Sequence, residues 1–237
     1  MRAVLRFLTL VLIPMLIVSM GSAMAEEAAE RKARSIEILR SEGVKYIDHL
    51  PKIETVDESL RRTEEDVVRR TLALAIVAVK AETDDYSLGQ ELIAQFGAEG
   101  FFTPHEEAFM KDRTPTEQER IQFVWRYEAV HVLLWAMGVY DEIGSAGVIT
   151  DVPLLAETLR DLGPDGLRAR ARLRSQAEIL DAADLIYRYH WAVVDARING
   201  RAAPTSLDPG VVYERHYTLN WLIGYSGQSW DDISTDT

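Results

Sequence analysis

The spacing of proline and glycine is the feature that most constrains the fold of this chain. These residues occur in clusters, and the long stretches 52–88, 116–137, 167–199 and 211–223 contain neither of them. Proline breaks helices and glycine weakens them, so the stretches favour helices and the clusters favour turns. Since no segment alternates apolar and polar residues as a strand does, the sequence predicts a single all-α domain.

Residues that favour helix termini locate several of these helices. Thr63 precedes an acidic first turn and predicts the start of a helix over 64–82, because a threonine side chain caps free backbone N–H groups and the helix dipole favours acids there. Asp208 and Pro209 in the same way predict the N-cap and first turn of a helix that covers 211–223.

Two of the predicted helices are apolar enough to be central. The first follows Thr116 and runs to about Tyr140, and its segment 121–140 is apolar on nearly all sides. The second lies within 167–199, either as one long helix or as two helices broken near Arg174. The sequence therefore predicts two buried central helices within a single multi-helix domain of about seven to nine helices.

Residues 1–25 have the pattern of a secretory signal peptide. Two arginines precede an uncharged apolar run, and Ala23 and Ala25 supply the small residues that signal peptidase requires. The sequence predicts cleavage between Ala25 and Glu26, export by the Sec pathway, and a periplasmic or secreted helical domain over 26–237. The alternative is an uncleaved membrane anchor, because the apolar run is just long enough to span a bilayer.

The charge and the cysteine content exclude several function classes. The chain carries a formal net charge of −12 and no cysteine. An acidic chain lacks the basic face that binding to nucleic acid or to an anionic membrane surface requires. Without cysteine there can be no disulfide, iron–sulfur cluster, cysteine zinc site or lipid-anchored cysteine. The sequence predicts neither a metal nor a cofactor, and it leaves a protein or a small molecule as the class of partner.

Glu128 and His131 are candidate site residues on the first central helix. Their Glu-x-x-His spacing occurs in di-iron helical bundles, but such a site needs a second copy of the motif, and this chain has none. We therefore interpret the two residues as a buried polar pair. A buried carboxylate without a partner is strongly destabilising, so Glu128 is expected to meet a cation or a donor from another helix.

A charged stripe follows the second central helix. Asp181, Asp184, Arg188 and Asp195 recur at helical spacing, and Asp184 can pair with Arg188 one turn later. Asp181 and Asp195 need partners from elsewhere in the fold. The last predicted helix offers three candidates: Arg215, His216 and Asn220.

Four arginines alternate where the stretch 167–199 begins. If this segment is helical, Arg168 with Arg172 and Arg170 with Arg174 form two rows of residues four apart. The two interpretations are a solvated face with some internal pairing and an anion-binding site.

Residues spread over three predicted helices and the C-terminal segment carry a family resemblance. They lie within 125–138, 178–196, 211–222 and 230–237. In these residues the chain, from about Ser35 to its C-terminus, resembles the bacterial family called domain of unknown function 4272. The resemblance implies a mostly helical domain without an assigned activity, and it transfers no catalytic residue. Export would be an addition to such a domain, because most members are not expected to be exported.

Two hypotheses for the function follow. In the first, the buried charges are structural and the protein is a binding or interaction module of the cell envelope. In the second, the protein is an enzyme or small-ligand binder with a polar cavity between the three helices that carry Glu128, Asp184 with Arg188, and His216. An accessible cleft with several of these groups favours the second hypothesis, and a fully paired, dry network favours the first.

Overall fold

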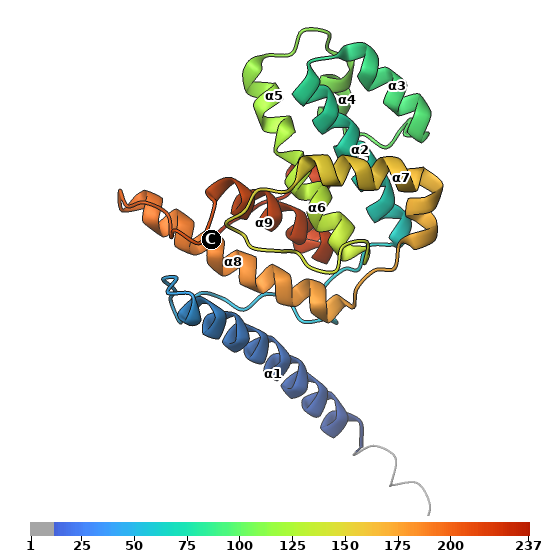
Figure 1. The fold of residues 1–237 in the computed structure, drawn as a ribbon. Helices are drawn as coiled ribbons and strands as arrows, with labels where there is room; N and C mark the ends of the chain where they lie inside the picture. Colours follow the sequence, from blue (N-terminus) through green and yellow to red (C-terminus); the bar gives the residue numbers. More distant parts are fainter. Residues whose placement is uncertain (1–11) are drawn as a thin grey trace, which may run out of the picture.

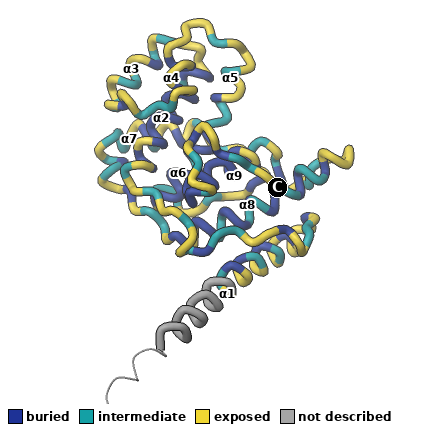
Figure 2. Tube along the Cα trace, turned by 180° about the vertical axis from the view of Figure 1, so that it is seen from behind, coloured by how far each residue is buried: buried dark blue, intermediate teal, exposed yellow. Residues whose placement is uncertain are grey.

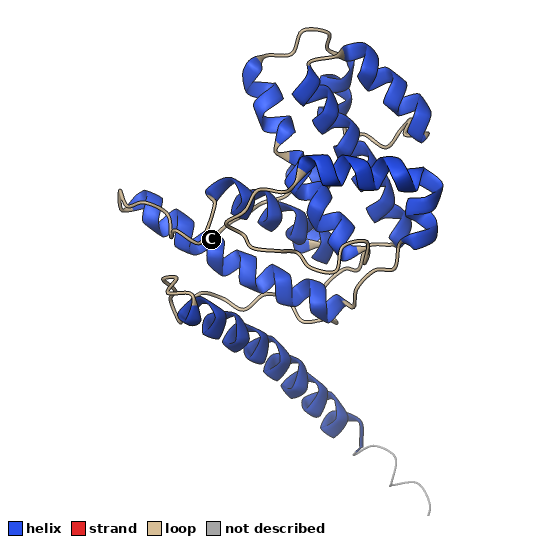
Figure 3. Ribbon diagram, in the orientation of Figure 1, coloured by secondary structure: helices blue, strands red, loops and turns tan. Residues whose placement is uncertain are grey.

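The computed structural model describes the backbone of residues 12–237 and the side chains of residues 26–237. The described residues form α-helices, short 3₁₀ turns and no strand, as Figure 3 shows, so the predicted all-α domain is confirmed. The α-helices are, in chain order, α1 Leu12–Ser41, α2 Glu64–Thr83, α3 Tyr86–Phe96, α4 Pro104–Lys111, α5 Glu117–Val124, α6 Arg126–Ala136, α7 Val152–Arg170, α8 Gln176–Ile198 and α9 Pro209–Ile223.

The helices pack in successive layers. α1 lies along α8, α8 packs on α9, α9 on α6, and α6 on α2 (Figure 1). On the far side of α2 lie α3, α4 and α5, which form a smaller cluster at one end of the molecule. The buried residues concentrate where α2, α6, α8 and α9 meet (Figure 2).

More helices are buried than the two that the sequence predicted. α2 buries most of its length, and α9 buries nearly all of its side chains. The burial of α9 was not evident from its composition, because its interior residues include Glu214, Arg215 and His216. Charged side chains can be buried in this way only where other helices supply partners, and a single helix does not reveal such partners.

The first predicted central helix is divided into α5 and α6. The break lies at Trp125, and the helix ends at Ala136 rather than near Tyr140. Gly138 follows with a φ of +68°, a left-handed conformation that suits glycine after a helix end. The side chain of Ile121 in α5 is 49% exposed, so the prediction of burial along the whole segment is wrong for α5.

The segment 167–199 forms two helices, as one of the two alternatives predicted. α7 ends at Arg170, and Ser175 caps α8 with a side chain that accepts a hydrogen bond from the Glu178 N–H group. The two arginine rows are therefore not formed. Arg172 and Arg174 instead lie in an extended segment whose N–H groups donate to the carbonyls that end α6, at 3.0 and 2.9 Å.

The predicted signal peptide lies partly outside the described residues, which begin at Leu12. α1 runs from there through the predicted cleavage point between Ala25 and Glu26 to Ser41. None of the helices in residues 12–237 combines the length and apolar character that a membrane span requires. Beyond the cleavage point, the fully buried Arg31 joins α1 to α8, because its Nε donates to the Asp181 carboxylate at 3.2 Å.

Candidate functional site

Glu128 lies in a buried cluster with Arg215. Its side chain is 1% exposed, and its Oε2 lies 3.2 Å from Nε of Arg215 on α9. Its Oε1 accepts from the backbone N–H group of Thr150. Burial raises the pKa of Glu128, while the Thr150 N–H group and Arg215 oppose this rise. The cation from another helix that Glu128 was expected to meet is therefore Arg215.

His131 completes this cluster with both ring nitrogens engaged. Its Nε2 lies 3.1 Å from the carbonyl oxygen of Ile143, and its Nδ1 lies 3.0 Å from the hydroxyl of Thr150. A carbonyl only accepts, so Nε2 carries the hydrogen and Nδ1 accepts from Thr150. Arg215 also donates to the carbonyls of Ile143 and Gly144, at 2.9 and 3.0 Å. The cluster fastens the segment 143–150 to α6 and α9.

The charged stripe of α8 divides among separate partners. Arg188 donates two hydrogen bonds to the carboxylate of Asp184, at 2.8 and 2.7 Å, and both side chains are buried. Asp181 pairs with Arg31 and Arg34 of α1. Asp195 pairs with Lys45 and with Arg201.

The helix α9 therefore supplies no partner to Asp181 or Asp195, although it was the expected source. Its Asn220 donates to the carbonyl of Ser234 in the C-terminal segment, at 2.8 Å. Its His216 faces α8 at another point, and its partner there is His190. The structure thus distributes the predicted site residues among several clusters rather than one shared cavity.

The pair of His190 and His216 joins α8 to α9 in the interior. The two Nδ1 atoms lie 2.8 Å apart, and the rings meet edge to face. His190 is 8% exposed and His216 is 2% exposed. Burial lowers the pKa of His190 to about 4 and that of His216 to about 3, with smaller contributions from the Arg197 charge and from His190 respectively. Both rings are therefore neutral near pH 7.

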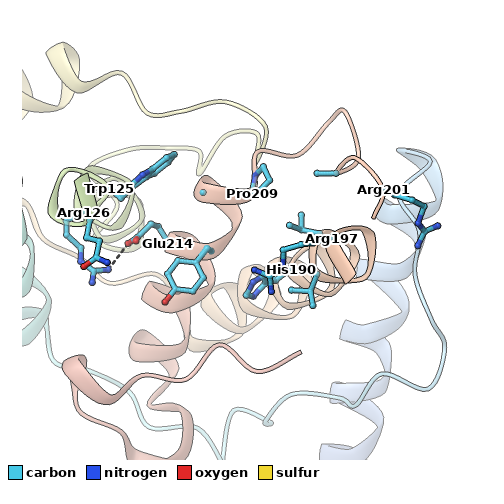
Figure 4. A pocket seen from close by; sticks show the side chains of 13 residues that line it. Trp125, Arg126, His190, Arg197, Arg201, Pro209 and Glu214 are labelled. Atoms are coloured by element: carbon cyan, nitrogen blue, oxygen red, sulfur yellow. Dashed lines mark hydrogen bonds and ion pairs between the residues drawn. The ribbon is translucent and has the colours of Figure 1, made fainter. Parts of the chain in front are cut away.

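His190 also lines a cleft of about 810 Å³, which we call the arginine cleft. Figure 4 shows Trp125, Arg126 and Glu214 on one side of this cleft, and His190 with Arg197 and Arg201 on the other. The remaining lining residues are Gln122, Val193, Val194, Ala203, Pro209, Gly210 and Tyr213. This volume lies in the range of small-molecule sites.

The charged groups of the arginine cleft differ in how they are engaged. Arg126 pairs with Glu214 at 2.8 Å, and this largely buried pair lines one side of the cleft. Arg201 pairs with Asp195. The guanidinium of Arg197, in contrast, forms no hydrogen bond or ion pair with any residue of the described part of the chain. Three arginines against one glutamate make this cleft locally basic in a protein with a net charge of −12.

Trp125 shapes the cleft by packing on the start of α9. A Cβ atom at Gly210 would lie 2.4 Å from its ring, so the contact requires glycine there. The break between α5 and α6 falls at this same tryptophan. The division of the predicted helix therefore places an aromatic ring in the wall of the cleft.

The sequence did contain a signal for one wall of the cleft. His190, Val193, Val194 and Arg197 recur at helical spacing on α8, on a face other than that of Asp184 and Arg188. His190 and Arg197 were not among the predicted site residues, because the charged residues of α8 are denser on the face that carries Asp184 and Arg188. Among the side chains of residues 26–237, no three metal-ligating groups converge on a common point.

Comparison with known families agrees with the fold. The family described as Domain of unknown function (DUF4272) matches residues 31–233. The chain belongs to this family. The match begins within α1, at the buried Arg31, and includes every residue of the arginine cleft. No curated protein and no solved structure matches the chain significantly.

Proposed function

We propose that this protein is an exported ligand-binding module of the cell envelope, and that the arginine cleft takes a small organic anion with an apolar body. The observation that carries the proposal is the unpaired guanidinium of Arg197 in a cleft of about 810 Å³. Guanidinium groups form strong paired hydrogen bonds with carboxylates and phosphates. Trp125, Val193 and Pro209 add apolar surface for the remainder of such a ligand.

Binding is favoured over catalysis by the groups that line the cleft. Among the described residues, its lining contains no serine, threonine or aspartate side chain, and its one carboxylate, Glu214, is held in an ion pair with Arg126. His190 has a pKa of about 4, which makes it a weak general base at neutral pH. Glu128, Asp184 and Arg188, which the enzymatic hypothesis uses, bind partners of their own and do not line this cleft.

Benzoate is a suitable probe, because it combines a carboxylate with an apolar ring. We expect it to bind the purified protein, with Arg197→Gln weakening the affinity about tenfold through the loss of a charged hydrogen bond. Isothermal titration calorimetry measures the affinity. Arg170→Gln is the matched control, because Arg170, like Arg197, is exposed and its side chain forms no hydrogen bond or ion pair within the described chain. Absence of binding, or equal affinity in wild type and Arg197→Gln, would contradict the proposal.

Export is tested separately by sequencing the N-terminus of protein isolated from the periplasm or the culture medium. We expect the mature protein to begin at Glu26, because Ala23 and Ala25 fit the small-residue pockets of signal peptidase. Ala25→Gln is expected to abolish cleavage. Met24→Gln is the matched control and should still be cleaved, because signal peptidase does not require a small residue at this position. An intact leader on the wild-type protein would rule out the predicted cleavage. Cleavage between Ala25 and Glu26 leaves Arg31 and its contact with α8 in the mature protein.

A further inference from the structure

A second cleft lies on the other side of the histidine pair. It measures about 600 Å³ and includes His216 in its lining, so we call it the carboxylate cleft for its three acidic residues. Glu54, Glu58 and Asp236 line it, against the single cation Lys52. Tyr187 and Tyr225 add aromatic surface. Its charge is thus opposite to that of the arginine cleft.

The buried His216 is the independent sign that this cleft receives a ligand. Its side chain is 2% exposed, and its Nδ1 is engaged with His190. Its ring lines the cleft, and its Nε2 has no hydrogen-bond partner within the described chain, so this nitrogen is free to receive one. His190 stands in the same relation to the arginine cleft, since its Nδ1 is also engaged and its ring lines that cleft.

The contact between the two Nδ1 atoms links the hydrogen-bonding character of the clefts. A neutral imidazole carries one N–H group, so only one Nδ1 of the pair can hold the hydrogen. If His216 donates from Nδ1, then His190 must carry its hydrogen on Nε2, in the ring that lines the arginine cleft. In that state Nε2 of His216 is bare and can only accept. The reverse state exchanges both roles.

We propose that the carboxylate cleft binds a primary amine, and that the histidine pair couples this amine to the anion of the arginine cleft. The inference rests on the proposed anion-binding function. An anion only accepts hydrogen bonds, so it selects the state in which His190 donates from Nε2. The same state presents a bare Nε2 of His216 to the second cleft, where an ammonium group donates to it beside Glu54 and Asp236. Each ligand therefore favours the binding of the other, by an equal factor.

The test uses benzoate as the anion and benzylammonium as the amine. We expect saturating benzoate to tighten benzylammonium binding about tenfold, a factor typical of coupling between sites. Saturating benzylammonium should tighten benzoate by the same factor. In ¹⁵N spectra of the histidine rings, the doubly bound protein should carry hydrogen on Nε2 of His190 and on Nδ1 of His216.

His190→Asn separates the coupling from the binding. Asparagine retains a polar group near the position of Nδ1 but has nothing at Nε2. Benzoate should therefore bind more weakly through the loss of this donor, while both ligands still bind and the mutual tightening disappears. His105→Asn is the control, because His105 is exposed and lies outside both clefts. The ¹⁵N spectra of the wild type give the tautomers even if His190→Asn does not fold.

The outcomes distinguish this inference from the proposed function. Binding of both probes without mutual tightening, or with the hydrogen on Nδ1 of His190, would overturn the coupling and leave the anion site intact. Failure of benzylammonium alone to perturb the His216 signals would overturn the amine site. Failure of benzoate to bind would overturn the proposed function and, with it, this inference.

Discussion

Arg215→Met is expected to lower the free energy of unfolding by about 3–5 kcal/mol, the usual cost of leaving a buried charge unpaired. Glu128 would remain in a site where it is 1% exposed, with only the Thr150 N–H group to stabilise its negative charge. Burial already raises the pKa of this carboxyl, and removal of the guanidinium would raise it further. The carbonyl of Gly144 would also lose its donor, and the carbonyl of Ile143 would keep only the ring N–H group of His131.

Urea unfolding followed by circular dichroism measures this effect. Arg170→Met is the matched control on the surface and should change the free energy of unfolding by less than about 0.5 kcal/mol. Glu128→Gln combined with Arg215→Met should recover part of the loss, because it removes the buried charge but leaves the carbonyl of Gly144 without the Arg215 donor. Limited proteolysis should detect early cleavage in the segment 143–150, which the cluster holds. A loss from Arg215→Met no larger than that of the control would contradict the structural role of the pair.

Acidification from pH 7 to pH 5 is expected to destabilise the protein by about 2 kcal/mol for each of His190 and His216. In the unfolded chain both histidines take up a proton near pH 6.5. In the folded protein burial lowers their pKa values to about 4 and about 3, so the rings stay neutral in this interval. The unfolded state then binds more protons, and stability is lost as the pH falls from about 6.5 toward about 4.

Urea unfolding at several pH values measures this dependence. The double variant His190→Asn with His216→Asn should have a flatter pH profile than wild type over this range, whatever its stability at neutral pH. His105→Asn should retain the wild-type slope, because His105 is exposed. Carboxylates contribute to the acid response of all three proteins, so the comparison isolates the buried pair. Equal slopes in wild type and the double variant would show that the two rings titrate in the folded state.

Features that depend on neighbouring residues were accessible from the sequence. The start of α2 at Thr63 was predicted, and its side chain accepts from the N–H group of Asp66, three residues later. Asp208 and Pro209 likewise begin α9 as predicted. The capping partners in both cases lie within three residues, so the local pattern is sufficient. The need of Glu128 for a cation was also evident from its surroundings, but the identity of that cation was not.

Features that depend on distant residues were not accessible. Glu128 and Arg215 are 87 residues apart, and Arg31 meets Asp181 across 150 residues. A helix offers several faces to its neighbours, and a sequence gives the composition of each face but not which helix packs on it. For this reason the sequence predicted partners for Asp181 and Asp195 on the last helix. Their partners in fact lie on α1 and in the flanking loops.

The sequence by itself determined that this protein is helical, where most helices begin, and that charged groups must be buried in pairs. It also carried the leader pattern that predicts export and the residues that resemble the family. Only the tertiary structure decided that Trp125 interrupts a helix to pack on Gly210, that His190 meets His216, and that Arg197 stands unpaired in a cleft. The physical reason is how far apart in the sequence the interacting residues lie. Helix formation and capping are satisfied within a few residues, whereas a cleft exists only after several helices have packed.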